Sequence, residues 1–100
     1  MSWDILLLRQ QVNLADPQAA DPGPLGPQED VVAQLRQLLP SLDCSDPTWG
    51  VLNTADYSIE FNLGRALLTD SLLLHVRGGG NPLAVVQLIC AHTGWVAYDC

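Results

Sequence analysis

The chain has 100 residues, 48% of them hydrophobic and 15% charged, a composition typical of one globular domain with a single core. Eleven carboxylates stand against four arginines and no lysine, so the formal net charge at pH 7 is −7. This balance argues against nucleic acids and anionic membranes as partners, because both are bound through clustered lysine and arginine. It favours a basic protein partner, toward which an acidic protein is steered.

The cysteines and the chain start indicate a cellular compartment. Cys44, Cys90 and Cys100 are too few and too widely spaced for the disulfide framework of a small secreted domain. The first residues lack the basic start of a signal peptide, and no apolar run reaches the roughly 20 residues that cross a bilayer. We therefore expect a cytoplasmic protein that does not bind membranes.

The first part of the chain predicts a strand, a loop and a helix. Residues 3–9 form a short, nearly continuous apolar run, which is typical of a strand buried on both faces. Residues 10–26 contain three prolines and no hydrophobic period, so they predict a Pro-rich loop. Residues 27–39 begin with a proline and two acidic residues and then carry apolar residues at helical spacing. That pattern predicts a helix with one buried stripe.

The second part of the chain predicts a turn, three strands, a helix and a closing strand. Ser45-Asp46-Pro47 indicates the turn, and Asn81 and Pro82 indicate the start of a helix that reaches about His92. The strands are expected at residues 49–53, 57–63, 71–77 and 95–99.

The expected order of elements is β-α-β-β-β-α-β, which belongs to the α+β class. We expect one domain over residues 1–100, with an antiparallel or mixed sheet and both helices packed on one face. This is a variant of the ferredoxin-like plan with one extra strand. The other face of the sheet would be partly open to water, which antiparallel sheets tolerate.

Alternation along two of these strands predicts a candidate ligand site. If residues 57–63 and 71–77 pair, Glu60 and Asn62 share the open face with His75 and Arg77. Three glycines follow directly, and glycines before a helix leave backbone N–H groups that can meet an anion. The candidate ligand-binding set is Glu60, Asn62, His75, Arg77, Gly78, Gly79 and Gly80. In the simpler interpretation, Glu60 and Arg77 form an ordinary cross-strand ion pair and the glycines only reverse the chain.

No complete catalytic motif accompanies this set. No lysine follows the glycines, as a P-loop would require, and the Gly-x-Gly-x-x-Gly pattern is absent. Cys90 and His92 are two positions apart on an expected helix, so they point in different directions and do not suit zinc. We expect no metal and no cofactor, and we favour binding over catalysis.

An apolar connection between strands points to a protein partner. Leu67 and Leu68 lie in the connection before residues 71–77, where apolar side chains usually meet a partner or fold back on the core. With the excess of carboxylates, this favours a protein-interaction module, of the inhibitor or immunity type or a homodimer. The alternative is a small-molecule or anion-binding protein, or a minor enzyme, that uses the segment from His75 to Gly80.

Three blocks of sequence also carry a resemblance. They are MSWDI at residues 1–5, SDPTWG at 45–50 with YSIEFNLG at 57–64, and LHVRGGG at 74–80. Together they resemble a group of small uncharacterised bacterial proteins that share these landmarks along nearly the whole length. The resemblance implies a bacterial, intracellular, single-domain protein and no catalytic role. The chain departs from the group at residues 65–68, where relatives tend to be acidic, and at Cys100, beyond which relatives tend to continue.

Overall fold

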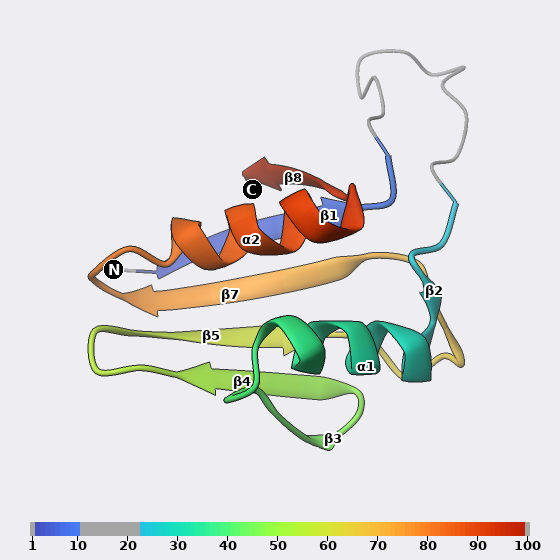
Figure 1. Ribbon diagram of the computed structural model, residues 1–100, viewed down its shortest axis with the longest axis horizontal. Helices are drawn as coiled ribbons and strands as arrows, with labels where there is room; N and C mark the ends of the chain where they lie inside the picture. Colours follow the sequence, from blue (N-terminus) through green and yellow to red (C-terminus); the bar gives the residue numbers. More distant parts are fainter. Residues whose placement is uncertain (1, 11–22, 100) are drawn as a thin grey trace.

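The structure is a computed structural model that describes residues 2–10 and 23–99. These residues form two helices and eight strands (Figure 1). In chain order they are β1 (Ser2–Leu8), β2 (Gly26–Pro27), α1 (Gln28–Leu38), β3 (Asp43–Asp46), β4 (Trp49–Asn53), β5 (Tyr57–Asn62), β6 (Leu68–Thr69), β7 (Leu72–Gly78), α2 (Leu83–Thr93) and β8 (Val96–Asp99). The predicted α+β class is confirmed.

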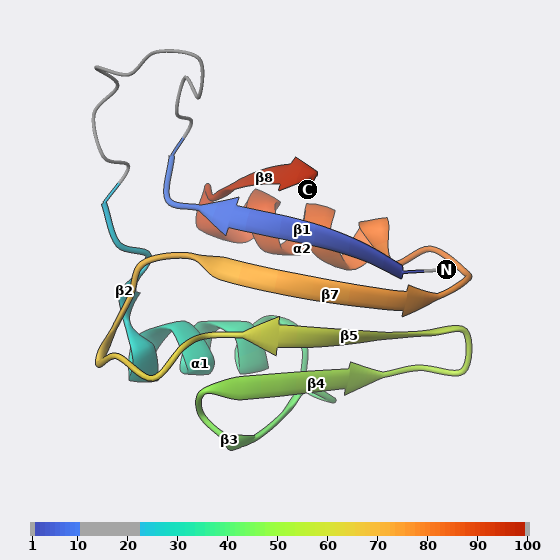
Figure 2. The ribbon, with the colours of Figure 1, turned by 180° about the vertical axis from the view of Figure 1, so that it is seen from behind.

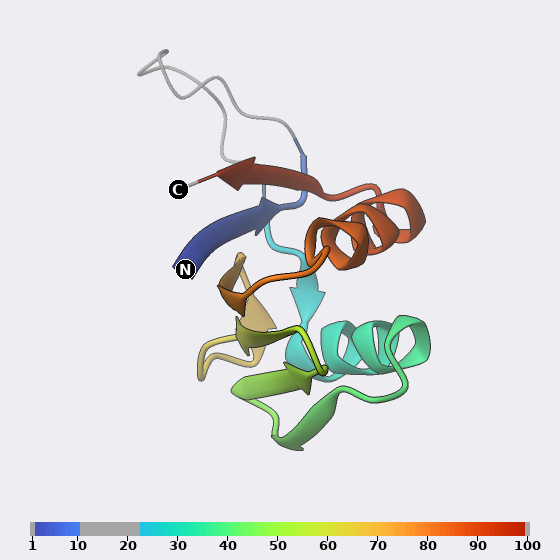
Figure 3. The same cartoon turned by 90° about the vertical axis from the view of Figure 1, so that its left-hand side faces the viewer.

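Six strands form one antiparallel sheet in the order β3-β4-β5-β7-β1-β8. One strand–helix–strand unit runs from β1 through α1 to β3, and the other runs from β7 through α2 to β8. Strand β7 lies between β1 and β5, and β1 lies between β7 and β8, so the two units interleave in the sheet. Figure 3 shows both helices on the same side of this sheet. Figure 2 looks onto the opposite side, where neither α1 nor α2 covers the strands. We call this side the open face.

The core lies between the sheet and the two helices. Every second residue of β5 and β7 is buried there, because successive side chains of a strand point to opposite faces. The buried sheet residues include Ile5, Leu7, Ile59, Phe61, Leu72, Leu74 and Val76, and the helices add Val31, Leu35, Val86 and Ile89. One-sided burial of this kind leaves the alternate residues of each strand on the open face.

Strand β1 departs from its prediction. The apolar run at residues 3–9 predicts burial on both faces, but only Ile5 and Leu7 are buried. Leu6 and Leu8 are half-buried, because they point to the side that the helices do not cover. The expectation of burial on both faces is therefore wrong, although the expectation of a strand is correct.

Three short strands were not predicted. Residues 45–47 predict a turn, but β3 runs through Asp46 and the turn falls at Pro47 and Thr48. Strands β2 and β6 form a separate ribbon, in which Gly26 lies opposite Thr69 and Pro27 opposite Leu68. The ribbon ties the connection between β5 and β7 to the start of α1, since the N–H of Gln28 donates to the carbonyl of Leu67 at 2.7 Å.

The loop predicted at residues 10–26 lies mostly outside the described residues, because residues 11–22 are not described. At its end, the N–H of Leu25 donates to the carbonyl of Thr69 at 2.8 Å. The cap predicted for α2 is wrong, because Pro82 and not Asn81 occupies the N-cap position. The end of α2 is as expected, with Gly94 in the left-handed region at φ 79°.

Two carboxylates shape the hairpin at the β3 edge of the sheet. Asp43 accepts hydrogen bonds from the hydroxyl and the N–H of Ser45, at 2.6 and 2.9 Å. Asp46 likewise accepts hydrogen bonds from the hydroxyl and the N–H of Thr48, at 2.6 and 2.9 Å. In each case the hydroxyl and then the backbone donor hold the pKa of the carboxyl below its usual range, because both favour the charged form.

These hydrogen bonds make the hairpin sensitive to acid. A carboxyl whose pKa is lowered by folding stabilises the fold fully above its ordinary pKa, and that stabilisation is lost as pH falls through the lowered value. We expect the free energy of unfolding to fall less on acidification in the double variant Asp43→Asn/Asp46→Asn, because an amide accepts hydrogen bonds but does not titrate. Urea unfolding of both proteins at pH 7 and at about pH 2.5 measures this difference. Equal losses in both proteins would show that the two turns contribute no pH dependence.

Candidate functional site

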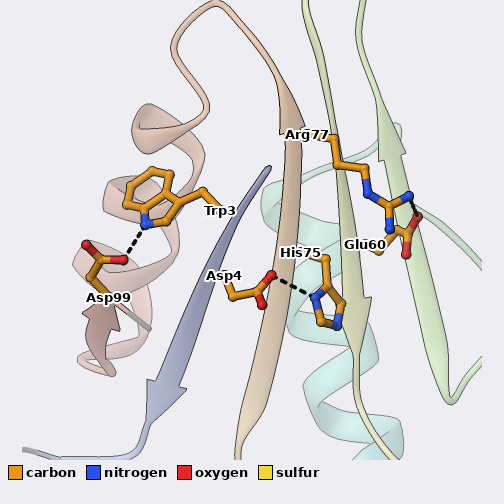
Figure 4. A network of polar contacts seen from close by, with 6 residues as sticks. All are labelled: Trp3, Asp4, Glu60, His75, Arg77 and Asp99. Carbon is orange, nitrogen blue, oxygen red and sulfur yellow. Dashed lines mark hydrogen bonds and ion pairs between the residues drawn. The ribbon is translucent and has the colours of Figure 1, made fainter. Parts of the chain in front are cut away.

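The open face brings together the three ionisable side chains that the sequence predicts there. Glu60 lies opposite His75 in the register of β5 and β7, and Ser58 lies opposite Arg77. The Nη1 atom of Arg77 donates to Oε1 of Glu60 at 3.1 Å (Figure 4). The side chain of Arg77 is 63% exposed, so the pair contributes under about 1 kcal/mol to stability.

A second polar pair on this face was not predicted. His75 Nδ1 lies 2.9 Å from Oδ1 of Asp4, because β1 flanks β7 and its Asp4 falls opposite His75 (Figure 4). The position of Asp4 between Trp3 and the buried Ile5 was the available signal, since a strict alternation from Ile5 places it on the open face.

Trp49 completes the cluster. Its indole stacks on the imidazole of His75, with ring centroids 5.8 Å apart and an interplanar angle of 23°. Trp49 belongs to β4, opposite Asn62, so its ring extends over β5 to reach β7. Trp49 is 36% exposed, whereas Trp95 is buried in the core.

An apolar row crosses the open face beside this polar cluster. The row consists of residues that lie opposite one another in successive strands, namely Trp49, Asn62, Leu73, Leu6 and Tyr98. All of these except Trp49 are half-buried. The open face thus has a polar half, which holds the Asp4–His75 and Glu60–Arg77 pairs, and an apolar half next to it.

The glycine hinge packs against a neighbouring turn. Gly78 has φ +105°, and a Cβ added there would lie 2.6 Å from the carbonyl oxygen of Asp56. The N–H of Gly79 donates to that same carbonyl at 2.8 Å. A Cβ added to Gly80 would lie 2.8 Å from Cβ of Asp56. The N–H of Gly79, which was expected to be available to an anion, is therefore bonded within the protein, and Asp56 lies beside the hinge.

The hinge also borders a cavity on the other side of the sheet. This cavity of about 270 Å³ is lined by Trp3, Val76, Pro82 and the three glycines. Val76 is a core residue and Trp3 packs against the core, whereas His75 and Arg77 point to the open face. The structure therefore brings Glu60, His75 and Arg77 together but separates them from the hinge cavity. Trp3 is held there by a hydrogen bond of 2.5 Å from Nε1 to Asp99 Oδ1 (Figure 4).

A larger cavity lies at the opposite end of the open face. It measures about 350 Å³ and lies between the half-buried Leu6 and Leu73 of the sheet and the connection between β5 and β7. We call it the connection cavity. Asn62 lines it too, and its Oδ1 accepts a hydrogen bond from the N–H of Gly64 at 3.2 Å. Asn62 was thus placed correctly on the open face, but it belongs to this cavity and not to the ionisable cluster.

The leucines of the predicted partner surface point apart. Leu67 is 90% exposed and lines a hollow with Pro27 and Gln28, whereas Leu68 is 47% exposed and lines the connection cavity. Only Leu68 therefore adjoins the open face.

Burial raises the pKa values of the Cys44 and Cys90 thiols. A raised pKa reduces the thiolate fraction at neutral pH, so neither cysteine is suited to act as a nucleophile.

No family model matches the chain, and neither a curated protein nor a solved structure matches it. None of the helices in the described ranges is long and apolar enough to cross a membrane.

The hinge can be tested with two neighbouring glycines. We expect Gly78→Ala to lower the free energy of unfolding by about 1–3 kcal/mol, since it places a Cβ at positive φ against the Asp56 carbonyl. Gly79→Ala is the matched control, because nothing lies within 4 Å of its added Cβ and its φ is not in the left-handed region. That variant should change stability by no more than about 0.5 kcal/mol in urea unfolding. Equal effects of the two variants would contradict this packing of the hinge.

Proposed function

We propose that this protein is a small interaction module that binds a basic protein through the open face of its sheet, with Trp49 at the centre of the contact. The observation that carries this proposal is a six-stranded sheet with both helices on one side, so that Trp49 and the apolar row lie on the side that neither helix covers. An uncovered apolar row beside polar groups is the usual composition of a protein-binding surface.

Trp49 is suited to anchor such a contact. Tryptophan is enriched among the few residues that contribute most of the binding energy at interfaces. Its indole is already held by stacking on His75, and the imidazole is in turn held by Asp4. A side chain fixed before binding loses little conformational entropy on association.

Charge favours a basic partner over a second copy of this chain. The formal net charge is −7, so two copies repel each other at long range while a basic protein is attracted. Asp43 and Asp46 lie on β3, next to Trp49 in the sheet, and add negative charge at the border of the apolar row. Such rim charges accelerate association and select against acidic proteins.

The same geometry gives less support to an anion site at the hinge. The guanidinium of Arg77 is paired with Glu60, and the N–H of Gly79 is bonded to Asp56. An anion would have to displace both of these contacts, and it would also be repelled by the net negative charge of the protein. We therefore propose binding and not catalysis, in the cytoplasm, as an inhibitor or immunity-type partner of a basic protein. We also propose that the chain is related to the group of small bacterial proteins that its sequence blocks resemble.

The proposal is tested by comparing two exposed apolar residues on opposite sides of the molecule. The partner is first captured from the source cell by a photoreactive amino acid placed at Val51 on the open face, and is then purified. We expect Trp49→Ala to raise the Kd for that partner at least about tenfold, since interface anchors contribute 2 kcal/mol or more. Leu88→Ala is the control, because Leu88 is 38% exposed on α2 and lies on the helix side.

The control variant should bind within about twofold of the wild type, and circular dichroism should show that both variants fold. A partner whose affinity depends on Leu88 and not on Trp49 would place the interface on the helices and overturn the proposal. An association rate that does not fall as salt is added would contradict the basic character of the partner.

A further inference from the structure

We infer that the connection cavity binds a small zwitterion with an apolar body, namely a free α-amino acid with an apolar side chain. The cavity measures about 350 Å³, which lies in the range of small-molecule sites and exceeds the volume of such a molecule. The inference goes beyond the proposed function, since it concerns a small-molecule ligand, although the cavity shares Leu6, Asn62 and Leu73 with the apolar row.

The cavity has an apolar floor and an anchored wall. Leu6 and Leu73 form the floor from two adjacent strands, where they lie opposite each other, and Leu68 adds an apolar side. The wall is the connection between β5 and β7, which the β2–β6 ribbon ties to α1. The side-chain amide of Gln28 also donates to the carbonyl of Gly64 at 2.7 Å. A wall held in this way needs little reordering when a ligand enters.

Opposite charges without short-range partners line this cavity. The guanidinium of Arg65 and the carboxylate of Asp70 are both exposed, and neither makes a hydrogen bond or ion pair with another described residue. The charge of Arg65 helps to lower the pKa of Asp46, but it is the smallest of several causes. Both charges are thus available to a ligand, in contrast to those of Glu60 and Arg77 at the other end of the open face.

Neutral polar groups complete the set. Asn62 lines the cavity, and its Oδ1 accepts from the N–H of Gly64, which leaves its amide NH₂ as a donor. Ser71 is half-buried in the lining and adds a hydroxyl.

This set of groups matches the two ends of an amino acid. A guanidinium binds a carboxylate in a planar, charge-assisted arrangement, with the Asn62 amide and the Ser71 hydroxyl as further donors. A carboxylate accepts hydrogen bonds from an ammonium group. A ligand with only one charge would pair with Arg65 or with Asp70 and leave the other charge unused. An apolar side chain would cover Leu6 and Leu73, which are only half-buried.

The experiment is an NMR titration of the ¹⁵N-labelled full-length chain with three probes. L-leucine carries both charges, N-acetyl-L-leucine lacks the ammonium group, and L-leucinamide lacks the carboxylate. We expect L-leucine to shift the amide signals of residues 64–71 saturably, and each analogue to bind at least about tenfold more weakly, because each loses one charge-assisted contact.

Two variants identify which residue binds the carboxylate of leucine and which binds its ammonium group. Arg65→Gln should remove the preference for leucine over leucinamide, and Asp70→Asn should remove the preference over N-acetyl-leucine. Arg36→Gln and Asp30→Asn on α1 are the matched controls and should leave all three titrations unchanged.

The inference is overturned if leucine gives no saturable shifts at residues 64–71, if the analogues bind as well as leucine, or if binding survives both cavity variants. Trp49 does not line the cavity, so Trp49→Ala should weaken protein binding without abolishing the saturable shifts with leucine. Failure of the cavity is therefore distinguishable from failure of the protein-binding face.

Discussion

Burial on one side of the sheet is the constraint on which the rest of the structure depends. Because both helices cover the same face, the side chains of each central strand alternate between the core and the open face. In β7, Leu74 and Val76 lie under the helices and His75 and Arg77 do not. A slip of one residue would bury an imidazole and a guanidinium and expose the core, so burial fixes the register firmly. The clustering of Glu60, His75 and Arg77 follows directly from that register.

Period-two alternation was therefore the part of the fold and of the candidate site that could be predicted. It is plain at residues 57–63 and 71–77, and it placed Glu60, Asn62, His75 and Arg77 on one face. The contacts of His75 with Asp4 and Trp49 could not be predicted in the same way. They depend on which strands lie beside β7, and Asp4 is 71 positions from His75 in the chain. Leu6 and Leu8 also hide the alternation of β1, because apolar residues occupy its open side too.

Short elements escaped prediction for a different reason, and the glycine hinge allowed two interpretations. Strands β2 and β6 have two residues each, too few to show a period, and β3 has the composition of a turn because Asp43 and Asp46 bind the backbone ahead of them. Three glycines before a helix suit an anion and suit close backbone packing equally well. The contact of Gly79 with Asp56 distinguishes the two, and it exists only once β5 and β7 have paired.

The two halves of the open face differ in what they can contribute to binding. Exposed ion pairs stabilise a fold by under about 1 kcal/mol, so the Glu60–Arg77 pair is not explained by stability. Its effect is to leave a nearly balanced charge beside the apolar row, which lowers the cost of removing water from that half. Further carboxylates lie at the border, on Asp43, Asp46 and Asp70. Long-range attraction and close contact therefore arise from different residues, so that salt would weaken the first while leaving the burial of Trp49 as favourable as before.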